Sequence, residues 1–241
     1  MTGCSSGFGL ALAARVLASG HRVIATARDP TTLTELATRF PDTCSVFALD
    51  VTDSAQVKNV VAESAAAFGR LDVIVNNAGY GLVGAFEELG EEQVARNFET
   101  NFFGAMNVIR AVLPILRSQH SGHIVNISAA AVISNYAGFS IYGASKWALE
   151  GVSESLASEL KPLGIKVTIV QPGPFRTDFT NSLECAENHI ADYDRTSGKF
   201  LRFIKTIIKS INAFNAMAFV CFFQINEQQI PAGREFICLP L

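Results

Sequence analysis

The sequence lacks the features that mark membrane, nucleic-acid-binding and disulfide-stabilised proteins. The apolar run over residues 216 to 223 has eight members, far fewer than the roughly 20 that cross a bilayer. Acidic residues outnumber basic ones by 22 to 19, so no basic surplus attracts nucleic acid or an anionic membrane. The five cysteines are scattered without paired spacing, which favours reduced thiols in a cytoplasmic protein.

Three further absences narrow the class of protein. Residues 1 to 20 contain a loop and an alanine-rich helical pattern, not the basic and apolar regions of a secretory signal. No G-x-S-x-G occurs, so there is no nucleophile elbow. His120 and His123 flank a Ser-Gly turn without an acidic or cysteine ligand nearby in sequence, and we therefore expect no metal site.

What the sequence does contain is a regular alternation of helical and strand patterns. With 241 residues, of which 49% are apolar, the chain can bury one large core. Continuous Val/Ile runs between helices predict an α/β fold, a single Rossmann-like doubly wound parallel sheet flanked by helices. Ligands bind beyond the carboxyl ends of the strands in such sheets. The predicted helices span residues 8 to 18, 33 to 39, 54 to 68, 91 to 117 with a possible kink at Pro114, and 142 to 160; the predicted strands span residues 21 to 27, 45 to 50, 71 to 76, 123 to 128 and 166 to 171.

A glycine-rich loop opens the chain with the letters MTGCSSGFG. Glycines allow backbone N–H groups to approach a pyrophosphate closely, and a helix that begins near Phe8 adds its positive end. The loop therefore predicts a phosphate site. The alternative is a tight turn of the kind found in many α/β proteins.

The stretch YGASK places Tyr142 and Lys146 one helical turn apart. Side chains at this spacing lie on one face of a helix, about 5 to 6 Å apart. A cation there lowers the pKa of a phenol by about 1 to 3 units, which suits an acid/base group near neutral pH. The alternative is a solvated amphipathic pair without a catalytic role.

Six motifs in order resemble those of the short-chain dehydrogenase/reductase family over residues 2 to about 198. They are TGCSSGFG at the start, NNAG at 76 to 79, ETN at 99 to 101, Ser128 after an apolar strand, YGASK at 142 to 146 and PGPFRT at 172 to 177. ATARDP (25 to 30), LDVTD (49 to 53) and YGASKWALEG (142 to 151) are most similar to the branch with 17β-hydroxysteroid dehydrogenase-like and retinol dehydrogenase-like enzymes.

The resemblance implies a Ser-Tyr-Lys-Asn group of catalytic residues. Tyr142 would exchange a proton with the substrate oxygen, and Lys146 would lower the tyrosine pKa and hold the nicotinamide ribose. Ser128 would donate a hydrogen bond to the same oxygen, while Asn101 would anchor a water that connects Lys146 to solvent. The alternatives are a strand-end cap for Ser128 and a local helix bond for Asn101.

The resemblance also implies a cofactor, and Arg28 suggests which one. NAD-preferring members have an acidic residue at the end of the second strand, whereas this chain has Thr26, Ala27 and Arg28. Because a guanidinium can bind a 2′-phosphate, we expect NADP(H) to be preferred over NAD(H), unless Arg28 is merely solvated or pairs with Asp29. The implied cofactor residues are Gly3, Ser5, Ser6, Gly7, Phe8, Gly9, Arg28, Asp50, Val51, Asn77, Ala78, Gly79, Tyr142, Lys146, Pro172, Gly173 and Thr177.

Two functions follow from the resemblance. The first is an NAD(P)-dependent oxidoreductase that acts on the CH–OH group of a secondary alcohol or on the corresponding ketone, such as a steroid, retinoid or other lipophilic carbonyl. The second is a truncated, catalytically inert relative that binds the cofactor without turnover. Homodimers and homotetramers are common in the family.

Both ends of the sequence depart from the family pattern. No strand pattern precedes the glycine loop, so we expect either that the reading frame starts too late or, as an alternative, that residues 216 to 223 fill the central strand position. The Rossmann and catalytic domain is expected over residues 1 to 198 and a divergent segment over 199 to 241. Residues 200 to 230 are either an aromatic lid over the substrate or a poorly ordered, aggregation-prone end, and residues 235 to 241 are a candidate last strand.

Overall fold

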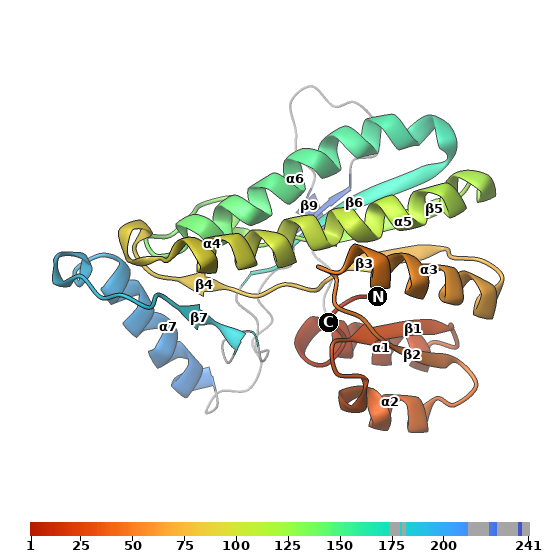
Figure 1. Cartoon of the computed structure of the whole chain (residues 1–241), viewed down its shortest axis with the longest axis horizontal. Coiled ribbons are helices and arrows are strands. Elements are labelled where there is room, and N and C mark those ends of the chain that lie inside the picture. The colour runs from red at the N-terminus through yellow and green to blue at the C-terminus, as the bar shows by residue number, and fades with distance from the viewer. Residues whose placement is uncertain (174–178, 180–181, 212–221, 226–235, 238–241) are drawn as a thin grey trace.

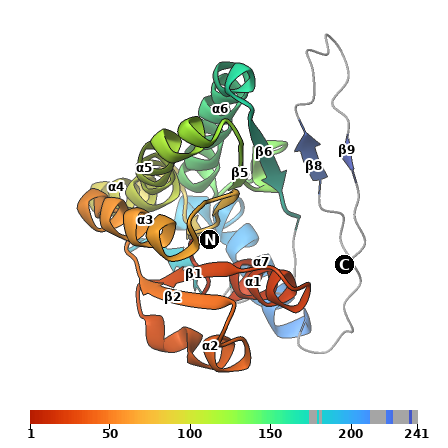
Figure 2. The same ribbon diagram turned by 90° about the vertical axis from the view of Figure 1, so that its right-hand side faces the viewer.

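The computed structural model describes residues 1–173, 179, 182–211, 222–225 and 236–237. Its longer elements alternate as the sequence predicts, with helices on both sides of parallel strands (Figures 1 and 2). The helices are α1 (Gly7–Ala18), α2 (Thr34–Arg39), α3 (Ser54–Phe68), α4 (Glu91–Phe98), α5 (Gly104–Gln119), α6 (Ser140–Leu160) and α7 (Ser197–Ile211); the strands are β1 (Val23–Ala27), β2 (Cys44–Ala48), β3 (Val73–Asn76), β4 (Leu82–Val83), β5 (Gly122–Ile127), β6 (Ile165–Gln171), β7 (Glu184–Cys185), β8 (Phe222–Ile225) and β9 (Phe236–Ile237).

The main strands form two hydrogen-bonded pieces. One piece pairs β1 with β2, and the other has the order β3-β5-β6-β8-β9. The pairs β1·β2, β3·β5 and β5·β6 are parallel, whereas β8 runs antiparallel to β6 and β9 antiparallel to β8. The predicted doubly wound α/β fold is therefore confirmed, with an antiparallel extension at one edge.

The segment ahead of α1 lies between the two pieces of sheet (Figure 2). On one side, the Met1 nitrogen donates to Ile24 O at 2.8 Å and the Met1 carbonyl accepts from Thr26 N at 3.1 Å. On the other side, Thr2 N donates to Val75 O at 3.0 Å. Residues 1–4 thus bridge β1 and β3 at the strand position that the sequence leaves open.

The other candidate for that position is wrong where the structure tests it. Phe222 and Phe223 belong to β8, opposite Gln171 and Val170 of β6, at the far side of the larger sheet. Residues 216–221 lie outside the described residues.

Local signals set the bounds of α3 at the residues that the sequence predicts. The Asp53 carboxylate accepts hydrogen bonds from the N–H groups of Ala55 and Gln56 at 2.9 and 3.0 Å, which satisfies two donors of the first turn. Gly69 ends the helix in the left-handed region, with φ of +77°. A capping aspartate and a terminal glycine are both readable from sequence.

The single helix expected over residues 91 to 117 is instead divided. A π-helical turn, Glu99–Phe103, separates α4 from α5, and α5 continues through Pro114 to Gln119. A π turn widens the helix by one residue and is frequent at functional sites. Here it contains Asn101, whose side chain is buried.

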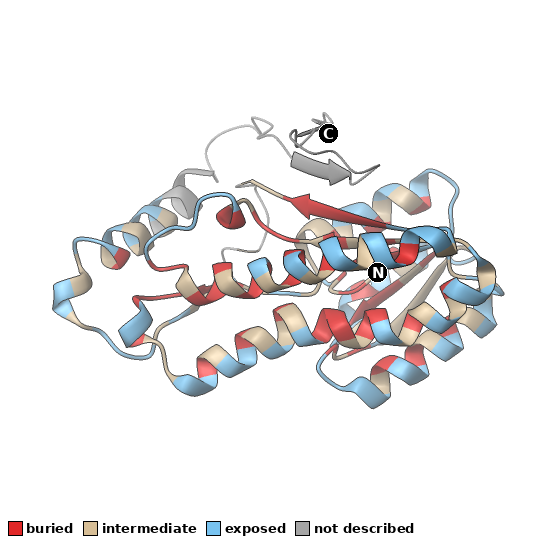
Figure 3. Cartoon of the chain, turned by 90° about the horizontal axis from the view of Figure 1, so that it is seen from above, coloured by how far each residue is buried: buried red, intermediate tan, exposed pale blue. Residues whose placement is uncertain are grey.

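The core lies between the larger sheet and helices α3, α5 and α6. Strand residues are mostly buried, and the helices alternate buried and exposed faces, as Figure 3 shows. The core includes the fully buried residues Val57, Val112, Leu116, Ile124 and Leu149. A second cluster joins α1 to β1 through Ala13, Leu17, Val23 and Ala25. Apolar residues at helical spacing and in the Val/Ile runs of the strands therefore face inward as predicted.

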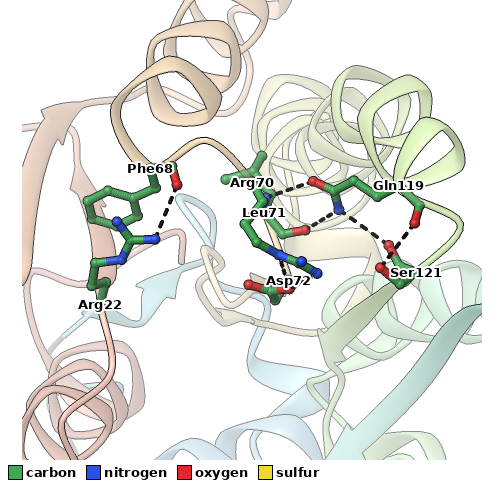
Figure 4. A network of polar contacts seen from close by, with 7 residues as sticks. All are labelled: Arg22, Phe68, Arg70, Leu71, Asp72, Gln119 and Ser121. Carbon is green, nitrogen blue, oxygen red and sulfur yellow. Dashed lines mark hydrogen bonds and ion pairs between the residues drawn. The ribbon is translucent and has the colours of Figure 1, made fainter.

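Polar contacts fasten the end of the sheet opposite the glycine loop (Figure 4). The Gln119 side chain binds both backbone groups of Leu71, accepting from its N–H at 3.0 Å and donating to its carbonyl at 2.7 Å. Arg22 donates to Phe68 O at 3.1 Å, and its guanidinium lies 4.5 Å from the centre of the Phe68 ring. These contacts tie β1 and α5 to the α3–β3 connection.

The C-terminal segment contributes a helix and the antiparallel strands. Helix α7 and the short parallel pair β4·β7 lie beyond the carboxyl end of β3 (Figure 1). β9 (Phe236–Ile237) lies within residues 235 to 241, where the sequence places a candidate last strand, and residues 238–241 lie outside the described residues. Across the described part of the chain, no helix combines the length and the apolarity needed to cross a bilayer.

Candidate active site

The described members of the predicted site lie on loops and helices at the carboxyl ends of the parallel strands. The glycine loop, the segment after β3, the π turn and the start of α6 all meet there. This edge of the sheet is where a doubly wound fold binds its ligands.

The glycine loop is too tightly folded for side chains at two positions. Gly3 has φ of +66°, and a Cβ built there would lie 2.8 Å from the Ala78 Cα. A Cβ on Gly9 would lie 2.2 Å from the Gly3 carbonyl oxygen and 2.6 Å from Asn77 Nδ2. Only glycine fits at these two positions, because each contact is with backbone or with a bound amide.

The loop is held by two residues, of which the sequence pattern identifies only one. Asn77 Nδ2 donates to the carbonyl oxygens of Thr2 and Gly3 at 3.0 and 2.9 Å. Thr2 was missed as a site residue, although its hydroxyl accepts from the N–H groups of Asn77 and Ala78, both at 3.0 Å. The available signal was a threonine directly ahead of the first glycine of the loop.

The start of α1 suits a phosphate group. Ser6 is the extended residue ahead of the helix, and its side chain makes no capping bond. The positive end of the helix dipole therefore faces the loop without a hydroxyl cap from Ser6 and without an acidic residue in the first turn of α1. Together with the two positions closed to side chains, this arrangement fits the pyrophosphate of a dinucleotide.

Tyr142 and Lys146 are both buried near the N-terminal end of α6. Lys146 Nζ donates to the Ile127 carbonyl at 2.9 Å. Burial lowers the pKa of Lys146 to about 8, and the nearby Glu150 carboxylate offsets part of that fall. The expected lowering of the Tyr142 pKa is not found: burial raises the pKa of the phenol above its usual value of 10.0. The cause is desolvation, because burial disfavours the charged phenolate.

Asn101 connects the π turn to the segment after β3 and to α6. Its Nδ2 donates to Tyr80 O at 3.0 Å and to Ser145 Oγ at 3.1 Å, and its Oδ1 accepts from Tyr80 N at 3.0 Å. A Cβ built on Gly79 would lie 2.9 Å from Asn101 Oδ1 and 3.2 Å from Lys146 Nζ. Asn101, Gly79 and Lys146 therefore converge.

Ser128 lies at the end of β5 and is buried. Its hydroxyl donates to Glu150 Oε1, and the same carboxylate accepts from Gln171 Nε2 at 2.9 Å through each oxygen. Ala129, the next residue, belongs to the buried cluster that contains Tyr142.

The adenosine-side residues follow β1 and β2. Arg28 is exposed, and in the described part of the chain it forms no ion pair with Asp29, whose carboxylate accepts from Thr31 instead. Asp50 accepts from Thr52 N at 2.9 Å. Val51 packs in the core with its carbonyl bound by Asn107.

The remaining predicted residues lie after β6. The Pro172 carbonyl accepts from Ala130 N at 2.9 Å, and Gly173 follows it. Thr177 lies outside the described residues, so its place among the cofactor-binding residues stays a prediction.

An aromatic wall stands beside Tyr142. The Tyr142 ring centre lies 5.0 Å from that of Phe139 and 5.7 Å from that of Phe179. Phe200 of α7 packs on Phe139 at 4.9 Å and on Tyr136 at 5.2 Å. The first half of α7 thus lines the surroundings of the phenol with apolar surface.

The described residues do not assemble a metal centre. Among them, no group of three or more His, Cys, Asp or Glu side chains is placed to hold a metal ion. His123 Nε2 lies 2.7 Å from Thr168 Oγ1, on the strand pair β5·β6.

Known proteins resemble this chain over most of its length. Residues 1–188 match the family described as short chain dehydrogenase. Oxidoreductase BOA17 of Botryotinia fuckeliana is 42% identical over 201 residues, which are 83% of this chain and 73% of that protein. The 3-ketodihydrosphingosine reductase of Bacteroides thetaiotaomicron is 41% identical over 213 residues, 87% of this chain and 75% of that protein.

Solved structures agree with this similarity. A short-chain dehydrogenase from Streptomyces avermitilis superposes with a TM-score of 0.80 at 42% identity, covering 88% of this chain and 80% of that one. A 3-ketoacyl-(acyl-carrier-protein) reductase from Brucella melitensis, complexed with NADH, superposes with a TM-score of 0.73 at 27% identity, covering 76% of this chain and 77% of that one. A metagenomic short-chain oxidoreductase in complex with NADP superposes with a TM-score of 0.68 at 33% identity, covering 73% of this chain and 81% of that one. Similar structures therefore hold either nicotinamide cofactor.

Proposed function

Because the chain belongs to the short-chain dehydrogenase family, we propose that it is an NADP(H)-dependent oxidoreductase that interconverts a secondary alcohol and a ketone. The observation behind this proposal is the convergence of Lys146 and Asn101 on Gly79, with Tyr142 one turn before Lys146. The glycine loop that fits a pyrophosphate lies at the same edge of the sheet.

In the proposed reaction, Tyr142 is the proton donor to the carbonyl oxygen. Burial keeps its phenol protonated at neutral pH, which is the form required of a general acid in reduction. The bound nicotinamide would supply the hydride. Lys146 would hold the ribose and place a positive charge beside the phenolate that remains after proton transfer, and Asn101 would fix the loop at Tyr80 that borders this region.

The preference for NADP(H) is proposed from Arg28. Its guanidinium is exposed just after β1, and the nearest carboxylate in sequence, Asp29, already binds Thr31. A bidentate contact with a 2′-phosphate is what this side chain can provide. Loss of a charge-assisted bond costs about 1.5 to 3 kcal/mol, so Arg28→Ala should raise the KM for NADPH by about 10- to 100-fold and leave that for NADH nearly unchanged. Arg15→Ala, an exposed arginine on α1, is the matched control.

A lipophilic substrate is proposed from the aromatic wall. Phe139, Phe179 and Phe200 surround or approach Tyr142, and a substrate oxygen that reaches the phenol must pass apolar side chains. A relative of this chain is a 3-ketodihydrosphingosine reductase by name, which is consistent with a long apolar ketone. The steroid and retinoid branch suggested by sequence stays a prediction, as do the cytoplasmic location and a homodimeric or homotetrameric state.

A second candidate function is cofactor binding without turnover. It is favoured by Ser128, because the role that the resemblance gives to its hydroxyl requires release from Glu150. Thermal unfolding with and without NADPH first tests whether the chain folds and binds the cofactor. Both functions predict that NADPH raises the Tm, whereas an unfolded chain shows no such rise.

A panel of ketones with NADPH then separates enzyme from binder. The proposed enzyme oxidises NADPH with at least one apolar ketone, and Tyr142→Phe lowers kcat by at least about 100-fold while the Tm shift by NADPH is kept. Absence of turnover across steroid, retinoid, sphingoid and short aliphatic ketones, together with a normal Tm shift, would leave the binder. No Tm shift with either cofactor would end both proposals.

A further inference from the structure

The hydroxyl of Ser128 is already used inside the protein. A hydroxyl has a single proton to donate, and Ser128 donates it to Glu150 Oε1. Gln171 Nε2 donates to both oxygens of the same carboxyl, at 2.9 Å each. Both carboxyl oxygens therefore serve as acceptors, as they do in an ionised carboxylate. The proton of Ser128 therefore points to Glu150, and a substrate oxygen can receive none from it.

The backbone of β5 explains why Ser128 faces this carboxylate. Asn126 and Ser128 are two residues apart and both bind α6, Asn126 through a 2.8 Å bond to Ser153 Oγ and Ser128 through Glu150. In extended backbone, successive side chains point to opposite sides. Ala129 is still extended, with φ of −157° and ψ of 151°, so its side chain takes the side opposite to Ser128.

That opposite side belongs to the catalytic phenol. Ala129 is buried in one cluster with Tyr142, Phe139 and Val83, whereas Ser128 is bound two helical turns further along α6, at Glu150. The residue that follows β5 and shares the surroundings of Tyr142 is therefore Ala129, which has a methyl group and no side-chain hydrogen-bond donor.

We infer that Ser128 is a positioning residue that ties β5 to α6 and β6 through Glu150 and Gln171, and that Ala129 occupies the place beside Tyr142 from which a side chain would reach the substrate oxygen. This inference rests on the proposed function for its catalytic consequence. Among the described side chains of β5 and of residues 128 and 129 after it, none then donates to the substrate oxygen, and Tyr142 acts without a second hydroxyl.

The inference predicts opposite effects for two neighbouring substitutions. Removing one donor to a developing oxyanion typically costs 10²- to 10³-fold in kcat, so adding one at the right place should recover part of this. Ala129→Ser should raise kcat/KM for the preferred ketone by about 10- to 100-fold. Ser128→Ala should change kcat by less than about 3-fold and lower the Tm by roughly 4–8 °C, because it leaves a buried carboxylate short of a donor.

A mutant cycle tests the positioning role without any turnover. The Tm of the protein without cofactor is measured for the wild type, Ser128→Ala, Glu150→Gln and the double variant. Residues that act through one hydrogen bond are not additive, so the double variant should unfold close to the worse single variant. Additive losses would overturn the role of Glu150 in holding Ser128, even in a chain that has no activity.

The kinetic outcomes divide in the same way. A loss of at least about 100-fold in kcat in Ser128→Ala, with no change in Tm and no gain in Ala129→Ser, would overturn the inference and return Ser128 to the substrate. Turnover in Ala129→Ser where the wild type has none would support the inference and explain an inert wild type. If neither protein turns over, the proposed function fails, and the Tm cycle alone decides whether Ser128 belongs to Glu150.

Discussion

Replacing Thr2 by valine tests how the glycine loop is held in place. The Thr2 hydroxyl accepts hydrogen bonds from the N–H groups of Asn77 and Ala78, both at 3.0 Å, and Thr2 is 5% exposed. Valine has nearly the same shape but offers no acceptor, so two backbone donors lose their partner. An unsatisfied buried donor costs about 1–3 kcal/mol, and we expect a total loss of about 3 kcal/mol after local relaxation.

The measurement is urea unfolding followed by circular dichroism, together with the Tm. A loss of about 3 kcal/mol lowers the Tm of a domain of this size by roughly 6–12 °C. The slope of the unfolding free energy against urea should stay unchanged, since the same surface is exposed. Affinity for NADPH should fall as well, because the Thr2 hydroxyl binds the backbone of Asn77, whose side chain holds the loop through the carbonyl oxygens of Thr2 and Gly3.

The matched control is Thr38→Val. Thr38 is exposed on α2, and its hydroxyl donates to the Thr34 carbonyl within the same helix, at 2.8 Å. We expect a change within about 0.5 kcal/mol there. If Thr2→Val unfolded at the same urea concentration as the wild type and the control, the segment at residues 1–4 would not be bound between β1 and β3 in solution.

Two further predictions concern the loop and the buried lysine. Gly9→Ala should weaken NADPH binding by at least about 10-fold in calorimetric titration, because the new Cβ would lie 2.2 Å from a backbone oxygen. The control is Gly151→Ala, where nothing lies within 4 Å of the new Cβ. This control should be neutral or should stabilise α6 by up to about 1 kcal/mol. Lys146 has a pKa of about 8 in the folded chain against 10.5 unfolded, so the unfolded state binds more protons between these values and the wild type should gain about 3 kcal/mol as the pH rises from 8 to 10.5. Urea unfolding at several pH values should show Lys146→Met more stable than the wild type below pH 8, with the difference shrinking towards pH 10; a constant difference would mean that the lysine is not buried.

Local patterns along the chain determine much of the fold. Asp53 marks the start of α3 because its carboxylate accepts hydrogen bonds from N–H groups of the first turn. Gly69 marks the end because glycine readily takes the left-handed conformation that stops the helix. The strands predicted at 71 to 76, 123 to 128 and 166 to 171 correspond to β3, β5 and β6 within a few residues. The apolar pattern of these segments is sufficient to predict them, because an element that packs against a neighbouring layer must present apolar side chains to it.

Other features depend on contacts between distant residues and were not predictable in this way. Thr2 binds residues 75 positions away, and β8 pairs antiparallel with β6 through positions that no local pattern marks. The π turn that brings Asn101 inward is also set by what it contacts, the Tyr80 backbone and Ser145. Each of these is a long-range hydrogen bond, and neither helical nor strand periodicity encodes its partner.

The sequence by itself determined the family, the layers and the types of residue at the site. Only the tertiary structure decided how deeply Tyr142 is buried and which group the Ser128 hydroxyl binds. Spacing on a helix predicts a lysine near the phenol, but the extent of burial decides the direction of the phenol pKa. Spacing along a strand allows either Ser128 or Ala129 to face Tyr142, and the pairing of β5 with α6 through Glu150 chooses between them.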